Sequence, residues 1–402
     1  MEGKLSSVAK TLKPSPIQQL SYLAERSNAI NLAEGFPDFP APPHIKDAAV
    51  SAITSDFNQY RHVQGICDLL ADKMKQMHGS DVDPLTDIAI CCGQTEVFAA
   101  TMFAILNPGD EVILFDPCFE TYETYILMAG GVPVYVALDP PYWRLDEVKL
   151  ADALTAKTKA LVLNSPHNPT GKVCNMEELQ IIAEYCRKND CIAVTDEVYE
   201  HLTYNNKPHI SLASLPEMQK RTIITSSLVG WAIGPSCIVL PIRNIHAKVT
   251  DSAPAPFQEA ALTALTSPPE YYKSLKRDYE LKRDFVFKLL EDVGFQVQFL
   301  AMGSFFIFAA LPETCKLTDV EFVEELIKEA GVVAVPGCGF FHGSSENGNM
   351  CRYIRFAFCK GDATLTSAAY KIKRLVDASG QLNVTEVSRI IKKLLNIQGA
   401  SP

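Results

Sequence analysis

Two spacings of apolar residues alternate along the chain from residue 46 to about residue 226. In the first, apolar side chains recur about every three to four residues, which is typical of a helix with one buried face. One such segment ends at Gly130-Gly131, a pair typical of a helix C-cap. This spacing predicts helices over 46–55, 67–78, 95–106, 120–129, 149–154 and 176–189.

The second spacing consists of short runs in which nearly every residue is apolar. Strands of this kind, placed between helices, are typical of a parallel sheet that is buried on both faces. The sequence therefore predicts an α/β fold with a mostly parallel central sheet, in a large domain over 46–270. The runs lie at 87–92, 111–115, 132–136, 160–164, 191–196 and 221–226.

The pattern changes on both sides of this region. Residues 1–45 contain repeated prolines, which fix φ and remove donors, and we interpret them as an N-terminal arm or loop. A long charged helix over 270–293 leads to strand pairs around GSFFIFAA and RYIRFAF, which predicts a smaller α+β domain over 271–377. The tail, 378–402, has apolar residues at helical spacing. We favour a surface helix or a loosely attached tail there over a specific docking element.

Composition and charge exclude several classes of protein. Of the 402 residues, 47% are hydrophobic and 21% are charged, which excludes a disordered or low-complexity chain. The net charge of −10 argues against a nucleic-acid partner. No apolar run reaches the roughly twenty residues that cross a bilayer, so no membrane span is expected. The N-terminus lacks the apolar core of a signal peptide. We expect a cytoplasmic protein, with a transit peptide as the weaker alternative.

The twelve cysteines form no CxxC pair and no Cys/His group at zinc spacing. Two of them, Cys91 and Cys92, are adjacent, which is unusual in a disulfide framework. We interpret the cysteines as reduced and mostly buried thiols, and we predict no metal site.

Polar residues follow three of the predicted strands, at the sheet edge where doubly wound α/β proteins bind their ligands. Gly93 opens a helix, and free N–H groups at a helix N-terminus can hold an anion. Asn168 lies in a loop fixed by two prolines, and Asp196 ends an apolar strand where an unpaired carboxylate is costly. Taken one at a time, these residues have plain structural alternatives: a turn glycine, a turn-capping Asn and a helix-capping Asp.

Taken together, the loops resemble those of the class I, fold-type I PLP-dependent aminotransferases, and within them the kynurenine/glutamine transaminase-like branch. The resemblance covers about residues 14–375, and NSPHNPTGK followed by DEVY is its most specific part. The matching motifs, in the family's order, are AEGFPDFP, NQY, CGQTE, DPCFETYE, NSPHNPTGK, TDEVYEHL, GSFFIFAA and YIRFAF.

The resemblance implies pyridoxal 5'-phosphate (PLP) as the cofactor and assigns residues to its ring. Asp196 would pair with the protonated pyridine nitrogen, which keeps the ring an electron sink. Asn168 and Tyr199 would hydrogen-bond the phenolic oxygen, and Phe119 would stack on the ring face.

The resemblance also implies how the PLP phosphate is held. The backbone amides of Gly93, Gln94 and Thr95 would bind it together with the hydroxyl of Ser227. Tyr60 would reach the phosphate of a partner subunit, which implies a homodimer.

Two further residues are implied to bind the substrate. Arg355 would grip the α-carboxylate as a bidentate fork, and Gly35 would close over the substrate from the N-terminal arm. The implied substrates are an amino acid and a 2-oxo acid.

The sequence departs from the family at the lysine that forms the Schiff base with PLP. In this branch the lysine lies in a stretch of the form SSxGKTFSxTGWKxGW, whereas residues 225–235 here read TSSLVGWAIGP. About ten residues are missing, including that lysine and a second lysine implied to hold the phosphate. No Lys occurs between Lys220 and Lys248, so no catalytic residue is assigned. Neither Lys220, which precedes the strand, nor Lys172, which active relatives also have, is a credible substitute.

We nevertheless expect the fold to survive this shortening. The resemblance implies that the strand ending near Ser226 and the strand beginning near Trp231 are antiparallel neighbours. The segment Leu228-Val229-Gly230 is long enough for a tight hairpin, and its glycine can take φ > 0.

Two functions remain open at this point. The first is an aminotransferase that moves an amino group between an aromatic or sulfur amino acid, of the kynurenine, glutamine or methionine type, and a 2-oxo acid. The second is a catalytically impaired or inactive member of the family, a pseudoenzyme that holds PLP weakly and non-covalently. Such a chain would act as a binding module or as the heterodimer partner of an active relative. A dehydrogenase is a poor third reading, because no G-x-G-x-x-G follows an early strand.

Overall fold

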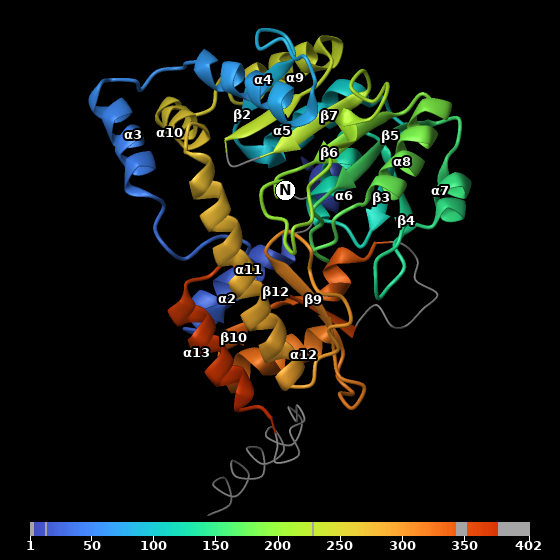
Figure 1. Cartoon of the computed structure of the whole chain (residues 1–402). Coiled ribbons are helices and arrows are strands. Elements are labelled where there is room, and N and C mark those ends of the chain that lie inside the picture. Colours follow the sequence, from blue (N-terminus) through green and yellow to red (C-terminus); the bar gives the residue numbers. More distant parts are fainter. Residues whose placement is uncertain (1–3, 13, 227–228, 343–351, 377–402) are drawn as a thin grey trace, which may run out of the picture. The chain divides into compact units, whose positions relative to one another are not determined.

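The computed structural model describes residues 4–12, 14–226, 229–342 and 352–376 (Figure 1). The chain divides into two compact units. Unit 1 comprises Met1–Leu12, Pro40–Asn168 and Lys172–Lys276, and unit 2 comprises Lys13–Phe39, Pro169–Gly171 and Arg277–Pro402.

Unit 1 is built on a seven-stranded sheet in the order β2-β8-β7-β6-β5-β3-β4. The neighbours from β7 to β4 pair in parallel, whereas β8 pairs antiparallel with both β2 and β7. This arrangement confirms the predicted α/β fold with a mostly parallel sheet. The strands are β2 (Ile88–Cys91), β3 (Glu111–Asp116), β4 (Val132–Ala137), β5 (Thr158–Asn164), β6 (Ile192–Asp196), β7 (Thr222–Ser226) and β8 (Gly230–Ile233).

Local sequence signals mark two of the helix ends in unit 1. The helix α8 starts after Asn175, whose side chain forms a capping box with Glu178, and α4 ends at Gly79 with a φ of 66°. The helices are α1 (Ser7–Thr11), α3 (Pro43–Thr54), α4 (Gln64–His78), α5 (Gly93–Ile105), α6 (Glu120–Met128), α7 (Glu147–Ala153), α8 (Met176–Lys188), α9 (Ser236–Val249) and α10 (Ala255–Leu265).

Both faces of this sheet are buried, which explains its apolar strands. On β7, Ile223 packs into a core with side chains of α5, α6 and α9, whereas the next residue, Ile224, packs into a second core with side chains of α4. Ala232 and Trp231 divide in the same way on β8. Successive side chains of a strand point to opposite faces, so the central positions of these strands are mostly apolar, and the charged residues lie toward the strand ends.

The strands on either side of residues 227–229 form the predicted antiparallel pair. In β7 and β8, Thr225 faces Ala232 and Ser226 faces Trp231, while Cys91 of β2 faces Gly230 on the other side. Residues 227–228 of the connection lie outside the described part of the chain.

The expected positive φ at Gly230 is wrong, since this residue lies within β8 and outside the left-handed region. A Cβ at this position would lie 2.2 Å from the carbonyl oxygen of Gly93. Glycine is therefore required because two backbones approach closely, and not because of the turn.

Unit 2 contains a three-stranded antiparallel sheet in the order β11-β12-β9, which contains both GSFFIFAA and RYIRFAF. A second, two-stranded sheet joins β1 in parallel to β10. The strands are β1 (Ile30–Asn31), β9 (Phe306–Ala310), β10 (Val332–Val333), β11 (Val335–Pro336) and β12 (Tyr353–Ala357). The helices are α2 (Pro16–Arg26), α12 (Asp319–Glu325) and α13 (Asp362–Lys373), together with α11 (Pro269–Asp292), which extends across the boundary between the units.

The six predicted helices and six predicted strands of the central region are all present, with ends shifted by a few residues. The eleven-residue helix α2 is a correction, because we interpreted its segment as an arm or loop. Its two prolines did not prevent it, since one precedes the helix and the other begins it, where no N–H is needed. The predicted helix in 378–402 lies outside the described residues.

The contact between Gly230 and Gly93 gives the first prediction. Replacing Gly230 with Ala should lower the free energy of unfolding by about 1–3 kcal/mol, because the added methyl group has no room against backbone. Gly339→Ala is the matched control, since no atom lies within 4 Å of the added Cβ. Urea titration followed by circular dichroism measures both variants. Equal stability of the two would contradict the proposed close approach.

Candidate functional site

The first part of the candidate site is the turn between β2 and α5. Gly93 has a φ of 84° and begins the helix, and Gln94 and Thr95 complete its first turn. No side chain caps this helix end. Such a turn presents backbone N–H groups and the positive end of a helix dipole to an anion.

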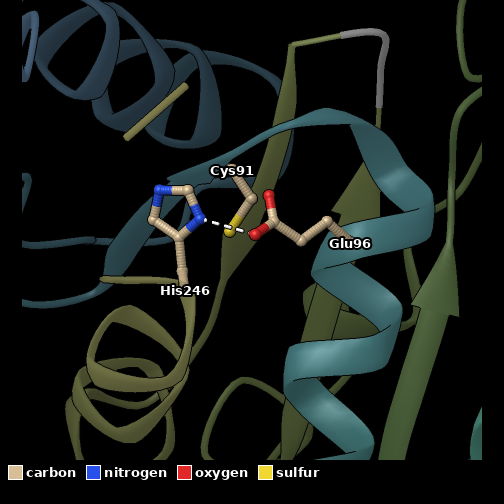
Figure 2. A group of neighbouring side chains, drawn as sticks. All are labelled: Cys91, Glu96 and His246. Carbon is tan, nitrogen blue, oxygen red and sulfur yellow. Dashed lines mark hydrogen bonds and ion pairs between the residues drawn. The ribbon is translucent and has the colours of Figure 1, made fainter. Parts of the chain in front are cut away.

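The side chain of Glu96 holds this turn in place. Its carboxylate accepts hydrogen bonds from the backbone N–H of Cys92 at 2.5 Å, from His246 Nδ1 at 2.9 Å and from the hydroxyl of Thr250. Figure 2 shows the carboxylate of Glu96, on α5, facing the ring of His246. Burial raises the pKa of Glu96, but these three hydrogen bonds outweigh it and bring the pKa down to about 2. The carboxylate is therefore ionised at neutral pH and holds the residue that precedes Gly93.

Cys91, Glu96 and His246 also place one ligand atom each within 4.8 Å of one another (Figure 2). A metal ion would need the thiolate of Cys91, but burial raises the pKa of this thiol far above its usual value. The Glu96 oxygens already accept three hydrogen bonds. We therefore interpret the group as a hydrogen-bonded support for the turn.

The second part of the site is Asp196, at the carboxyl end of β6. Its Oδ2 accepts hydrogen bonds from the Tyr122 hydroxyl at 2.6 Å and from Gln94 Nε2 at 2.9 Å, and its Oδ1 accepts one from the Val198 N–H at 3.1 Å. Tyr122, which sequence reasoning missed, lies one helical turn after Phe119. The detectable signal was the i, i+3 spacing within DPCFETYE.

The charge state of Asp196 is unusual because the donors that contact it are all neutral. Burial raises its pKa from 3.8 to about 6, although the hydrogen bonds from Tyr122 and Val198 partly oppose the shift. A buried carboxylate of this kind is favourable only when a cation or a proton joins it. The residues at this position therefore suit a ligand with a protonated ring nitrogen.

The loop after β5 holds Asn168 in place through Asn164. Asn164 Oδ1 accepts from the Asn168 N–H at 2.7 Å, while its Nδ2 donates to the carbonyls of Pro166 and Asp196 at 3.1 and 3.0 Å. One buried amide thus links the Asn168 loop to the end of β6. Asn168 is itself buried, with 8% of its surface exposed.

Phe119 lies immediately before α6, and its ring meets that of Tyr122 edge to face, with centroids 5.8 Å apart. Tyr199 is half-buried, three residues after Asp196. Tyr60 is 75% exposed. Ser227 lies outside the described residues.

The implied substrate residues Gly35 and Arg355 both belong to unit 2. The Arg355 side chain is buried, donates from Nη2 to the carbonyl of Ala33 at 2.7 Å and lies 4.1 Å above the ring centroid of Phe306. A Cβ on Gly35 would lie 2.5 Å from the Phe306 ring. Unit 2 therefore holds the guanidinium beside the Gly35 segment.

The lysines Lys172 and Lys220 lie close in sequence to the loop after β5 and to β7. The Nζ of Lys172 donates to the Trp143 carbonyl and to the Glu178 carboxylate, and its side chain is buried. Lys220 is exposed and precedes β7. Lys172 is thus used in holding the loop after β5.

Comparison with known proteins identifies the family. Residues 27–369 match the family described as Aminotransferase class I and II. The chain belongs to this family. Human kynurenine–oxoglutarate transaminase 1 is 32% identical, over 90% of this chain and 95% of its own length. Methionine aminotransferase of Escherichia coli K12 is 31% identical, over 93% of this chain and 98% of its own.

Solved structures agree with this assignment. The N-succinyldiaminopimelate aminotransferase of Mycobacterium tuberculosis superposes with a TM-score of 0.88 at 33% identity, covering 92% of this chain and all of that chain. A Thermus thermophilus aspartate aminotransferase double mutant gives 0.84 at 27% identity, covering 92% and 99%. The family consists of fold-type I transferases that use PLP to move an amino group between an amino acid and a 2-oxo acid.

Two other expectations concern cysteines and membranes. The eleven cysteines in the described part of the chain are all free thiols, most of them buried. None of the described helices combines the length and the apolar character that crossing a bilayer requires.

The raised pKa of Asp196 predicts how stability depends on pH. The folded chain binds this proton more tightly than the unfolded chain, so stability should fall as pH rises from about 4 to about 6. Asp196→Asn removes the buried charge, and the Tyr122 hydroxyl and the Gln94 amide can turn to accept from the new amide. At pH 8 the cofactor-free variant should be more stable than the parent by up to about 3 kcal/mol.

Thermal melts of both proteins at pH 4 and pH 8 measure this effect. The gain should vanish at pH 4, where the parent carboxyl is protonated as well. A variant less stable than the parent at pH 8 would show that the carboxylate is compensated in the cofactor-free fold.

Proposed function

We propose that this protein binds PLP at the Asp196 site and moves an amino group between an aromatic or sulfur amino acid and a 2-oxo acid. The observation that carries the proposal is Asp196 itself, a buried carboxylate whose contacting donors are neutral and whose pKa is raised to about 6. A protonated pyridine nitrogen is the cation that this family brings to such a site.

The roles of the binding residues follow from their positions. When bound, PLP supplies an electron sink for bonds at the amino acid Cα. Asp196 keeps the ring nitrogen protonated, and Tyr122 and Gln94 hold that carboxylate in place. Asn168, positioned by Asn164, and Tyr199 donate to the phenolic oxygen.

The remaining cofactor contacts are steric and electrostatic. Phe119 stacks on the ring, and the amides of Gly93, Gln94 and Thr95 bind the phosphate together with Ser227. Glu96 supports these amides by fixing the Cys92 N–H.

Arg355 binds the substrate α-carboxylate and Gly35 closes over the substrate. The buried, ring-stacked guanidinium of Arg355 supports this role, because a preorganised fork loses little entropy on binding a carboxylate. The aromatic or sulfur side chain follows from the relatives, which include a kynurenine–oxoglutarate transaminase and a methionine aminotransferase.

The protein acts as a homodimer in which Tyr60 reaches the PLP phosphate of the partner subunit. The 75% exposure of Tyr60 in the single chain supports this arrangement, because a large aromatic ring gains from being covered. The cytoplasm is the proposed location, supported by the free thiols of the described residues.

The missing stretch between β7 and β8 changes the strength and the chemistry of this site. The residues named above hold PLP through its phosphate, its ring nitrogen and its ring face, without the covalent link of the family's lysine. Binding is therefore weaker than in the relatives. Proton transfer by a general base contributes about 10²–10⁴-fold to a rate, so amino transfer is slowed by at least this factor if no other amine serves.

A second candidate function rests on the same missing stretch: a pseudoenzyme that completes a heterodimer with an active relative. No Lys lies between Lys220 and Lys248, yet the pairing of β7 with β8 is intact. The fold can therefore form without the family's catalytic lysine, and Tyr60 remains available to a partner.

PLP binding tests the main proposal. Equilibrium dialysis of the chain against PLP should show one saturable site, and Asp196→Asn should weaken it about 10- to 100-fold because a charge-assisted hydrogen bond is lost. The affinity of the parent should rise as pH increases through about 6, where Asp196 ionises. Equal affinity of parent and variant at pH 8 would reject Asp196 as the partner of the ring nitrogen.

Co-expression separates the second candidate from the first. With a tagged active relative, the chain should appear in mixed dimers in which the active subunit is completed. Tyr60→Phe should weaken PLP binding in the active subunit if the hydroxyl reaches its phosphate. Recovery of homodimers only would argue against the heterodimer function and leave the homodimeric enzyme.

A further inference from the structure

The shortened β7–β8 region borders a large cavity within unit 1. Its volume is about 640 Å³, in the range of small-molecule sites of about 300–1,000 Å³. Ser226 and Val229, on either side of the shortened connection, both line it. Most of the other lining residues are apolar, and the largest group of them lies on α10: Phe257, Ala260, Ala261, Ala264 and Leu265.

This cavity adjoins the candidate PLP site at two points. Val198, two residues after Asp196, lines it, and the Val198 N–H is a donor to that carboxylate. Cys92, the residue before Gly93, lines it as well. The cavity wall therefore includes a residue close to Asp196, the proposed partner of the ring nitrogen. It also includes the residue before Gly93, where the proposed phosphate-binding turn begins.

Among the described residues that line the cavity, one carries an amine: Lys73 of α4. Its Nζ lies 2.8 Å from Glu200 Oε1 and 2.9 Å from His201 Nε2, and both partners line the cavity too. The Lys73 side chain is 23% exposed and therefore only partly buried. By contrast, the buried Nζ of Lys172 is held by Trp143 and Glu178.

We propose that Lys73 supplies the amine that the shortened β7–β8 region lacks, by forming an imine with the aldehyde of PLP across this cavity. The inference rests on the proposed function, because it requires PLP at the Asp196 site. It assigns the covalent link to a helix remote in sequence from the family's lysine segment.

The step balances without any further reactant. The N–C bond forms between Lys73 Nζ and the aldehyde carbon, and the carbonyl oxygen leaves as water with two of the three ammonium protons. One proton and the positive charge stay on the imine nitrogen, so Glu200 keeps its ion-pair partner. The amine must lose a proton before it attacks, and His201 Nε2 is placed to accept this proton and to return it to the departing oxygen.

His201 and Glu200 are in suitable protonation states for this step. Burial lowers the pKa of His201, and although Glu200 opposes the shift, the imidazole is neutral at neutral pH and can accept a proton. Burial raises the pKa of Glu200, but the Lys73 ammonium outweighs it, so the net shift is downward and the carboxylate is ionised.

Borohydride trapping of the full-length chain tests the proposal. After incubation with PLP and reduction, peptide mass mapping should locate one dominant adduct, on Lys73. Lys73→Arg keeps a cation beside Glu200 but cannot form an imine, so it should lose at least nine tenths of the fixed adduct. Equilibrium dialysis without borohydride measures the total reversible binding of PLP. For Lys73→Arg this binding should be weaker, because the imine is lost, but it should remain saturable.

Lys276→Arg is the matched control. Lys276 also belongs to unit 1 and donates to the Thr203 hydroxyl at 3.4 Å, but it does not line the cavity. This variant should keep the full adduct on Lys73.

Each outcome decides the proposal. Saturable PLP binding without a fixed adduct, or an adduct spread over several lysines and unchanged in Lys73→Arg, would overturn the role of Lys73 and leave the proposed PLP site intact. Absence of saturable PLP binding in the parent would overturn both proposals. A dominant adduct on Lys73 that the arginine variant abolishes would establish the link.

Discussion

The burial of one carboxylate at the end of a parallel strand is the constraint on which the site of unit 1 depends. The Asp196 carboxylate accepts hydrogen bonds from the Gln94 amide, the Tyr122 hydroxyl and the Val198 N–H. The backbone carbonyl of Asp196 accepts a further hydrogen bond from the Asn164 side chain. Because none of these donors carries a charge, the carboxylate remains costly to ionise in the cofactor-free fold. Among the described residues no cation contacts this carboxylate, and its ionised form becomes favourable when a cation joins it.

Only three residues separate β7 from β8, and both strands are fully paired in the sheet. The ladder of β8 with β7 and with β2 depends on strand residues, and its register is complete on both sides. A cavity lies beside Ser226 and Val229, and Lys73 is one of its lining residues.

Much of the fold was predictable because its signals are local. Apolar runs located the strands of the central sheet, and helical spacing located the helices between them, to within a few residues. The helix Pro16–Arg26 was missed because prolines were taken as breakers, although at a helix start they are favourable. The sequence also did not show why residue 230 must be a glycine. A Cβ at this position would collide with the backbone of Gly93, which is far away in sequence.

The sequence by itself determined the family motifs, the positions of Asp196 and Asn168 at strand ends, and the absence of a lysine between residues 220 and 248. Only the tertiary structure showed that Tyr122 and Gln94 both donate to the same Asp196 oxygen, that Glu96 holds the turn before α5, and that Lys73 lines the cavity beside β8. The physical reason is the range of the interactions. Hydrophobic spacing and motifs are written in neighbouring residues, whereas hydrogen bonds, buried charges and cavity walls join segments that meet only after the chain has folded.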